Sequence, residues 1–372
     1  MSQVNRETDV FIAGGGPAGL AAAIACRQRG LRVAVADVCH PPIEKPCGEG
    51  LMPDAIDILR RLGVVLPPNA GFPMTGIRFL GADAAVEASF PNGIGVGIRR
   101  RVLHEALTRS AEAAGAALMW GARVTGPFSG GVMINGQPLR CHWVVGADGE
   151  RSQIRRWTGL DQPAHYARRF GFRRHFLVPP WTDRVEVHWG RAAQFYVTPV
   201  SPREVCVVLL SRDRHRRIRT ALSEFPDLQA RLDGAPSGPE RGALSVSQQL
   251  RCVARGNVAL VGDCSGSVDA VTGEGLCLAF RQAEALASAI DAGDLRLYAA
   301  AHRRFLRRPA LMARLLLTMD RFDLIRRRAL RTLSAKPEIF ANLLAAHVAG
   351  RPAAELVVGG IVPLGLSMLA VR

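Results

Sequence analysis

The sequence lacks the patterns by which several classes of protein are recognised. Of its 48 basic residues, only Lys45 and Lys336 are lysines. The whole chain has three tyrosines, and no basic stripe in it is interleaved with aromatic residues. Because no groove-reading motif is present either, nucleic acid is not expected as a partner. The eight cysteines include no Cys-x-x-Cys pair. We therefore expect reduced thiols rather than a disulfide framework, and no metal site.

A signal peptide and a membrane-spanning helix are not expected. Residues 1–9 are polar and lack the apolar core of a signal peptide, which predicts a cytoplasmic protein. Residues 356–371 are uncharged, but this run contains Pro363 and is shorter than the roughly 20 apolar residues that cross a bilayer. The formal charge of +16 favours contact with anionic membranes, acidic carrier proteins or phosphate-bearing cofactors.

The sequence does contain a strand–turn–helix–strand unit near its start. Its apolar strand, alanine-rich helix and second apolar strand are expected at residues 9–13, 17–30 and 31–36. The turn between the first strand and the helix reads GGGPAG, which fits the pattern G-x-G-x-x-G. In this pattern Gly14 takes the tight turn, Gly16 lets the backbone approach a pyrophosphate, and Gly19 lets the helix pack on the strand.

An acidic residue completes this nucleotide-binding pattern. Asp37 ends the second strand, eighteen residues after Gly19. A carboxylate at that point accepts hydrogen bonds from both hydroxyls of an adenosine ribose and disfavours a 2′-phosphate. The free N–H groups and the dipole of the helix favour the phosphates. The site is therefore expected to hold FAD or NAD rather than NADP.

Two later segments favour FAD over NAD. Residues 144–155, VVGADGERSQIR, match the pattern G-A-D-G-x-x-S-x-x-R. Residues 258–263, VALVGD, form a buried strand that ends in Gly-Asp. The Asp263 carboxylate can bind the ribityl hydroxyls, and the helix N-terminus that follows can face the N1–C2=O edge of a flavin. Donors at that edge favour the negative charge of a reduced flavin.

In these three segments and their order, the chain resembles the FAD-dependent superfamily that joins para-hydroxybenzoate hydroxylase-type monooxygenases with geranylgeranyl reductases. The resemblance covers about residues 9–290 and implies non-covalently bound FAD. It also implies that Arg100 reaches the pyrophosphate, that the Val124 backbone meets adenine, and that Asp148 serves both FAD and NAD(P)H. The residues expected to bind the cofactor are Gly14, Gly16, Pro17, Ala18, Gly19, Asp37, Arg100, Val124, Asp148, Gly262, Asp263, Gly273, Glu274 and Gly275.

Details of two segments resemble the geranylgeranyl reductase branch more closely. Residues 45–50, KPCGEG, resemble its Pro-Cys-Gly-Gly-Gly segment near the isoalloxazine, and residues 262–266, GDCSG, resemble its Gly-Asp-Ala-Ala-Gly segment. The histidine that many hydroxylases place just after the second segment is absent. The chain departs from both groups at Ala270, where proline is usual, and at Glu49 and Glu274, where glycine is common.

The candidates for catalysis are Cys47, Glu49, Glu274 and Tyr196. The two carboxylates either donate or accept a substrate proton, or remain solvated or cap backbone N–H groups. Cys47 is either a reactive thiolate or a buried neutral thiol. Tyr196 lies in an expected strand, where it either donates a hydrogen bond to a substrate carbonyl or phenol or is an ordinary sheet tyrosine. The same two interpretations apply to His188.

The remaining segments predict an α/β protein with an inserted antiparallel sheet. Helices are expected at residues 53–62, 100–114 and 273–292, and strands at 124–145 (with a hairpin turn at 135–136), 185–189, 194–198, 205–210 and 257–261. We expect a Rossmann-like, para-hydroxybenzoate hydroxylase-like FAD-binding domain interleaved with an antiparallel β substrate domain, followed by basic C-terminal helices. The expected boundaries are 1–75, 98–160 and 250–295 for the first, 76–97 and 161–249 for the second, and 296–372 for the helices.

These inferences predict an FAD-dependent oxidoreductase that acts on a hydrophobic small molecule of isoprenoid or polyketide type. The favoured reaction is reduction or dehydrogenation of a C=C bond. The alternatives are aromatic hydroxylation with NAD(P)H and O2, and a non-catalytic flavin-binding protein that holds an acidic partner. No second G-x-G-x-x-G is present, so NADH or NADPH would dock transiently as reductant. The C-terminal helices either cover the substrate domain or lie on an anionic membrane.

Overall fold

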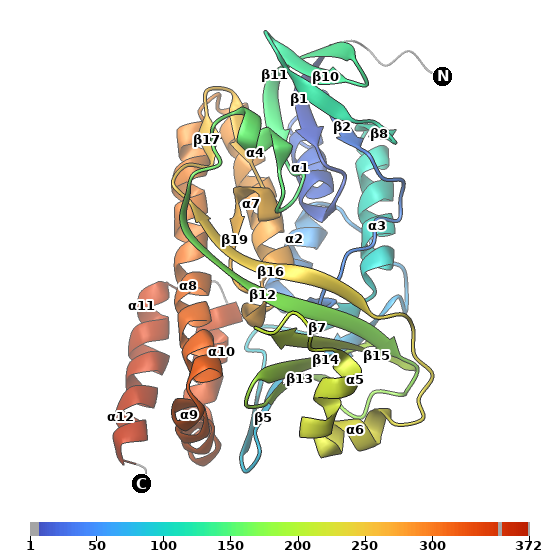
Figure 1. Cartoon of the computed structure of the whole chain (residues 1–372). Coiled ribbons are helices and arrows are strands. Elements are labelled where there is room, and N and C mark those ends of the chain that lie inside the picture. The colour runs from blue at the N-terminus through green and yellow to red at the C-terminus, as the bar shows by residue number, and fades with distance from the viewer. Residues whose placement is uncertain (1–6, 349–351, 371–372) are drawn as a thin grey trace.

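The computed structural model describes residues 7–348 and 352–370, and two large sheets organise it (Figure 1). The first sheet contains the predicted nucleotide-binding unit. Its core strands are all parallel and lie in the order β18-β11-β1-β2-β8. Their bounds are β1 (Glu7–Ala13), β2 (Val33–Asp37), β8 (Ala117–Trp120), β11 (Gln137–Gly146) and β18 (Val258–Leu260). The antiparallel strands β9 (Val124–Phe128), β10 (Gly131–Ile134) and β17 (Ala254–Arg255) extend it.

Helices cover this sheet and explain why its central strands are apolar throughout. Val10, Phe11 and Ile12 of β1 are fully buried, as expected for a parallel strand with both faces covered. Around the sheet lie α1 (Pro17–Arg27), α2 (Pro53–Arg61), α3 (Arg100–Ala113), α4 (Gln153–Trp157) and α7 (Gly275–Asp291). The predicted hairpin turn is confirmed: Asn135 and Gly136 have φ values of +48° and +80° between β10 and β11.

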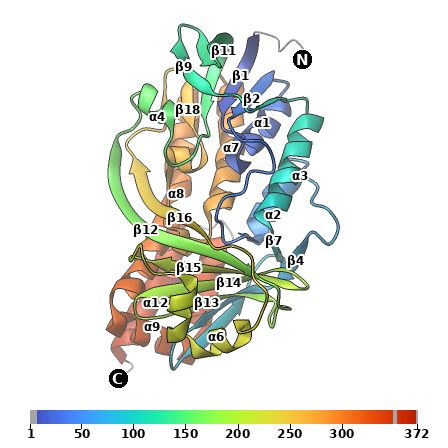
Figure 2. The same cartoon turned by 45° about the vertical axis from the view of Figure 1, so that its right-hand side comes forward.

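The second sheet is mainly antiparallel, with the order β19-β16-β12-β15-β14-β13-β5-β6. Its bounds are β5 (Gly76–Leu80), β6 (Ala85–Ser89), β12 (Pro163–Phe176), β13 (Arg184–Trp189), β14 (Ala193–Ser201), β15 (Glu204–Ser211), β16 (Arg241–Leu250) and β19 (Gly266–Ser267). The long strands β12 and β16 curve from the first sheet towards the far edge of the second (Figures 1 and 2). A small third sheet contains β3 (Gly50–Leu51), β4 (Gly71–Met74) and β7 (Gly95–Ile98).

Helices pack on both faces of the second sheet. On one face, Phe195 and Val197 of β14 pack with the short helices α5 (Ile218–Ala221) and α6 (Pro226–Leu232). On the other lie α8 (Leu295–Arg321), α9 (Asp323–Ala335), α10 (Pro337–Val348), α11 (Ala353–Leu356), a π-helical turn (Val357–Ile361) and α12 (Val362–Ala370). The expectation that the C-terminal region is helical and covers the second sheet is thus confirmed. Among the residues described, no helix is long and apolar enough to cross a membrane.

Candidate functional site

The glycine-rich turn has the geometry that its pattern predicts. Gly14 has a φ of +111°, and a Cβ there would lie 2.3 Å from the Ala147 carbonyl oxygen. A Cβ on Gly19 would lie 1.9 Å from the Gly14 carbonyl oxygen, so both positions require glycine. In contrast, a Cβ on Gly16 would meet no atom within 4 Å. Gly16 therefore faces open space at the N-terminus of α1, where a pyrophosphate can approach.

Asp37 is held beside this turn. Its Oδ2 accepts a 2.7 Å hydrogen bond from the Gly15 N–H, and its Oδ1 accepts one of 2.8 Å from the Cys39 N–H. A Cβ on Gly15 would lie 2.3 Å from the Trp120 ring, which packs against the turn. The carboxylate is thus fixed next to the expected phosphate position, where the adenosine ribose would lie. Val124 begins β9 near this end of the site but does not line the cavity described next.

A cavity of about 400 Å³ begins at the glycine turn and extends to the second sheet. At its first end it is lined by Gly16, Pro17, Ala18, Arg100, Gly262, Asp263, Gly273 and Gly275, all predicted cofactor residues. Within the described residues, the buried Nε of Arg100 has no hydrogen-bond partner. Its placement fits a phosphate oxygen, and the exposed Asp263 fits a hydroxyl-rich ribityl chain. The residues present therefore fit FAD.

Asp148 has another role in this structure. Its Oδ1 accepts the Ser152 hydroxyl at 2.5 Å, and its Oδ2 accepts the backbone N–H groups of Gln153 and Ile154. These bonds satisfy free donors at the start of α4. The carboxylate does not line the cavity. Its expected contribution to FAD and NAD(P)H binding stays a prediction.

Glu49 occupies a backbone conformation that normally favours glycine. Its φ is +59°, and its side chain is almost completely buried. The Oε2 lies 2.6 Å from His175 Nε2, and the Oε1 lies 3.4 Å from Arg173 Nη1. The Oε1 also accepts a 2.9 Å bond from the Arg100 N–H at the start of α3. The carboxylate therefore joins the loop 45–50 to β12 and α3, in addition to lining the cavity.

Two cysteines lie close to Glu49: the catalytic candidate Cys47 and the buried Cys206. Cys47 lines the cavity, and its Sγ lies 3.4 Å from the Glu49 N–H. Cys206 donates a weak 3.6 Å hydrogen bond to the Cys47 carbonyl oxygen, and burial raises the pKa of the Cys206 thiol well above its usual range. Glu49, His175 and Cys206 are close enough to bracket an ion. The Arg173 guanidinium already supplies a positive charge there, 2.9 Å from His175 Nδ1.

Glu274 lies just before α7 and is paired with two residues that the sequence did not indicate. Its Oε1 accepts a 2.9 Å hydrogen bond from Arg308 Nη2, and its Oε2 lies 3.4 Å from His347 Nδ1. The other ring nitrogen of His347, Nε2, is 3.0 Å from the Thr272 carbonyl oxygen. Nε2 thus faces an acceptor oxygen, whereas Nδ1 and Glu274 Oε2 have no hydrogen-bond partner within the described residues; the ring lines the cavity. Arg308 lies in an arginine-rich stretch of α8 and His347 near the end of α10, and no local pattern singles out either residue.

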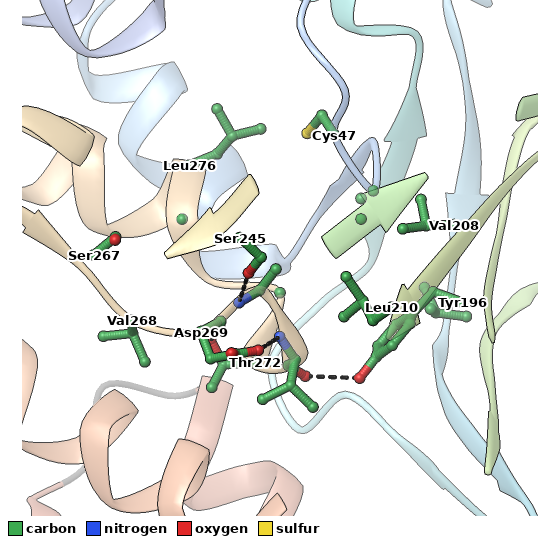
Figure 3. Close-up of a pocket in the computed structure, with 18 of the residues that line it drawn as sticks. Cys47, Tyr196, Val208, Leu210, Ser245, Ser267, Val268, Asp269, Thr272 and Leu276 are labelled. Carbon is green, nitrogen blue, oxygen red and sulfur yellow. Dashed lines mark hydrogen bonds between the residues drawn. The ribbon is translucent and has the colours of Figure 1, made fainter. Parts of the chain in front are cut away.

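Tyr196 projects from β14 into the cavity, which is one of the two placements considered for it (Figure 3). Its hydroxyl donates a 3.1 Å hydrogen bond to the Val271 carbonyl oxygen, and burial raises its pKa well above the usual range. Asp269 holds the same loop by accepting the Val271 N–H at 3.0 Å, and its carboxylate in turn lies 3.3 Å from Arg169 on β12. The tyrosine proton is therefore engaged with the loop 269–272. Sequence reasoning missed both Asp269 and Arg169.

The alternative that His188 faces the substrate is wrong. Val185 and Val187 of β13 line the cavity, so the alternate residues Glu186 and His188 point to the opposite face of the sheet. There His188 Nε2 lies 3.1 Å from Glu186 Oε2, and the ring packs edge-on against Phe225. Alternation along the strand predicts that neighbouring side chains point to opposite faces, but it does not show which face lines the cavity.

Beyond Tyr196 the cavity is apolar. Side chains from the second sheet line one wall, and four C-terminal helices supply the other. The sheet contributes Ile77, Phe79, Val185, Val187, Val208 and Leu210, while α8, α9, α10 and α12 contribute Met312, Leu315, Leu316, Met319, Leu333, Phe340, Leu343, Leu344 and Leu364. One cavity thus joins a polar, glycine-lined end to a long apolar end.

Comparisons with known proteins agree with this geometry. The chain is 27% identical over 354 residues to the menaquinone reductase of Mycolicibacterium smegmatis, covering 86% of this chain and 87% of that protein. It is 26% identical to the ubiquinone hydroxylase UbiL of Rhodospirillum rubrum, over 78% of this chain and 74% of that one. The structure of a flavoprotein/dehydrogenase from Cytophaga hutchinsonii superposes with a TM-score of 0.84 at 15% identity, covering 98% of this chain and all of the other.

A family model supplies the assignment. The model described as "FAD binding domain" matches residues 7–296, more than three quarters of the chain. This range contains the glycine turn, Asp37, Arg100 and Asp263, whose placement fits FAD. The chain therefore belongs to the FAD binding domain family and is an FAD-dependent enzyme of its oxidoreductase and monooxygenase group.

Proposed function

We propose that this enzyme reduces a carbon–carbon double bond in a long apolar substrate of the isoprenoid quinone type. The observation that carries the proposal is the continuous cavity, which runs from the glycine turn to a wall of aliphatic and aromatic side chains. An extended apolar chain gains free energy from such a wall, about 25 cal/mol for each Å² removed from water. The name of the mycobacterial relative, menaquinone reductase, supports the same substrate class.

The resemblance of residues 45–50 and 262–266 to segments of geranylgeranyl reductases also supports reduction of a C=C bond. Both segments line the polar end of the cavity through Cys47, Gly262 and Asp263. When bound, reduced FAD supplies a hydride. Saturation of a double bond then needs one proton for the second carbon. NADH or NADPH would supply the electrons for the next turnover.

His347 is the best-placed proton donor. It lines the cavity, and its buried Nδ1, 3.4 Å from Glu274 Oε2, has no hydrogen-bond partner within the described residues, so an N–H at that nitrogen is not engaged with the protein. Glu274 lies beside the ring, and its carboxylate is itself held by an ion pair with Arg308. Glu274 itself does not line the cavity, whereas His347 and Gly273 do. We therefore assign proton transfer to His347 and a positioning role to Glu274.

Hydroxylation with O2 is the second candidate, because one relative is named as a ubiquinone hydroxylase. An anaerobic experiment separates the two reactions. The purified enzyme is photoreduced without O2 and mixed with a menaquinone-type substrate, and oxidised-flavin absorbance is followed. Reduction of the C=C bond predicts return of the absorbance and a product that stays two mass units heavier after its quinone ring has been reoxidised in air. Hydroxylation predicts no reaction until O2 is admitted, followed by a gain of one oxygen atom.

The proton donor is tested with His347→Asn. General acid catalysis typically contributes about 10²–10⁴-fold to a rate, so kcat should fall by at least about 100-fold while KM changes little. His188→Asn is the matched control, because that buried histidine lies on the other face of the sheet and should leave kcat nearly unchanged. A His347→Asn enzyme with full FAD content and normal kcat would remove His347 from the mechanism.

A further inference from the structure

The helical segment 353–370 has an apolar outer face. Its inner face, at spacings of four, four and three residues, is buried: Leu356, Gly360, Leu364 and Ser367. The opposite face carries Val358, Val362, Leu366 and Leu369, which are 72, 48, 64 and 81% exposed. A helix on the surface of a soluble protein normally turns charged or polar side chains outward. These four residues, here named the apolar ridge, form a continuous apolar strip that water does not favour.

Positive charge accompanies the ridge on the neighbouring helices. Residues 296–372 contain fourteen Lys and Arg against four acidic residues, which is ten of the sixteen net charges of the chain. On α8, spacings of four, seven and seven residues place four exposed arginines along one face: Arg303, Arg307, Arg314 and Arg321. Among the residues described, none of these four forms an ion pair. This basic stripe is therefore free to attract an anionic surface.

The ridge and the stripe belong to one helical layer. α11 packs against α8, and α12 packs against α9, along the outer edge of the molecule (Figures 1 and 2). Within the same turns, Leu364 lies between the ridge residues Val362 and Leu366 and lines the apolar end of the cavity. A single helix thus separates the cavity from the apolar ridge.

From these observations we infer that the outer face of segment 353–370 inserts into the headgroup region of an anionic lipid surface. Apolar side chains backed by arginines are the composition of an interfacial helix, which lies in the membrane plane without crossing it. An acidic protein would explain the arginines but not the strip of four exposed aliphatic residues. The further step, that substrate passes from the bilayer into the cavity beside α12, rests on the proposed function.

Vesicle flotation with the FAD-loaded full chain tests this inference. Vesicles of phosphatidylcholine alone are compared with vesicles containing 30% phosphatidylglycerol, at low and at physiological salt. We expect binding to the anionic vesicles that weakens as salt rises, because exposed charges are screened. Each juxtamembrane arginine contributes about fivefold in affinity, so Arg314→Gln/Arg321→Gln should bind at least tenfold more weakly.

The ridge variant is Leu366→Ser/Leu369→Ser, for which we expect at least a roughly tenfold loss of vesicle affinity. Its control, Val65→Ser/Leu177→Ser, changes two equally exposed apolar residues outside the C-terminal layer, and Arg101→Gln/Arg109→Gln on α3 controls for charge. Both controls should bind vesicles as the unmodified chain does. FAD content and circular dichroism verify that every variant is folded.

Three outcomes would overturn the inference. The first is no binding to anionic vesicles at low salt, and the second is a ridge variant that binds like its control. The third is a ridge variant whose only change is in the oligomeric state, which would assign the ridge to contact between copies of the chain. A short soluble substrate assays the proposed function separately: its turnover should survive in the ridge variant. If the unmodified enzyme turns over no substrate yet binds vesicles, the proposed function fails and the docking surface stands.

Discussion

Replacement of Glu49 by glycine sets two opposing effects against each other. At a φ of +59° a non-glycine residue costs about 1–2 kcal/mol relative to its ordinary conformations, so glycine relieves strain in the folded state. Glycine also makes the unfolded chain more flexible, which lowers the free energy of unfolding by about 0.5–1 kcal/mol. The net gain from the backbone therefore lies between about 0 and 1.5 kcal/mol.

The side chain acts in the other direction. Its loss leaves Arg173 and His175 without their buried carboxylate, and breaking a buried ion pair from one side typically costs about 3–5 kcal/mol. Arg173 keeps its 2.7 Å contact with Glu44, so the lower end of this range applies. The Arg100 N–H at the start of α3 also loses its acceptor, which adds about 1 kcal/mol. After the backbone gain is subtracted, we expect Glu49→Gly to destabilise the protein by about 2.5–4 kcal/mol.

Urea unfolding followed by circular dichroism measures this change. Asn69→Gly is the control, because Asn69 has nearly the same φ, +60°, on an exposed turn without an ion pair. Its free energy of unfolding should stay within about 0.5 kcal/mol of the unmodified value, since asparagine tolerates this region. A Glu49→Gly protein as stable as the unmodified chain, or more stable, would refute the view that the carboxylate holds this part of the site together.

Three further predictions concern the cofactor turn, the cavity and the pH dependence of stability. Gly16→Ala should fold normally but bind FAD more weakly, whereas Gly19→Ala should also destabilise the fold, because its Cβ would lie 1.9 Å from a backbone oxygen; flavin titration and thermal melts distinguish the two. Leu344→Trp should lower kcat/KM for long-chain substrates by at least about tenfold and leave short ones unaffected, since it fills the apolar end of the cavity; equal losses for both would contradict the assigned position of the chain. Burial lowers the pKa of His302 to about 4 from its usual 6.5, so the unfolded chain binds a proton that the folded one does not, and this contribution is lost as pH falls from 6.5 towards 4. In His302→Gln the loss of stability between pH 7 and pH 5 should therefore shrink by about 2 kcal/mol in urea titrations, and an unchanged difference would contradict the shift.

Local pattern was sufficient for the parts of the molecule that depend on neighbours in sequence. The strand, turn and helix around Gly14, the hairpin at Asn135 and the three strands after residue 184 were all predicted, because turn chemistry and periodicity act over a few residues. The C-terminal helices were predicted for the same reason. FAD could be predicted as the cofactor because the short segments that bind it have recognisable residue patterns.

The rest depends on contacts between distant segments. β12 was not recognised before Phe170 because Arg168 and Arg169 interrupt its apolar alternation, yet Arg169 is buried against Asp269, a hundred residues away. β16 and the helices α5 and α6 were also missed, since their packing partners lie elsewhere in the chain. Likewise, no local pattern predicts that Glu274 contacts Arg308 and His347.

We expect one cavity to hold both the flavin ring and an extended apolar chain. A series of isoprenoid quinones that differ only in chain length tests it most directly, with binding followed by the perturbation of flavin absorbance. Each added isoprene unit should tighten binding at least about tenfold until the apolar end between the second sheet and α8–α12 is full, after which affinity should level off. Affinity that is independent of chain length from the shortest member onward would contradict the claim.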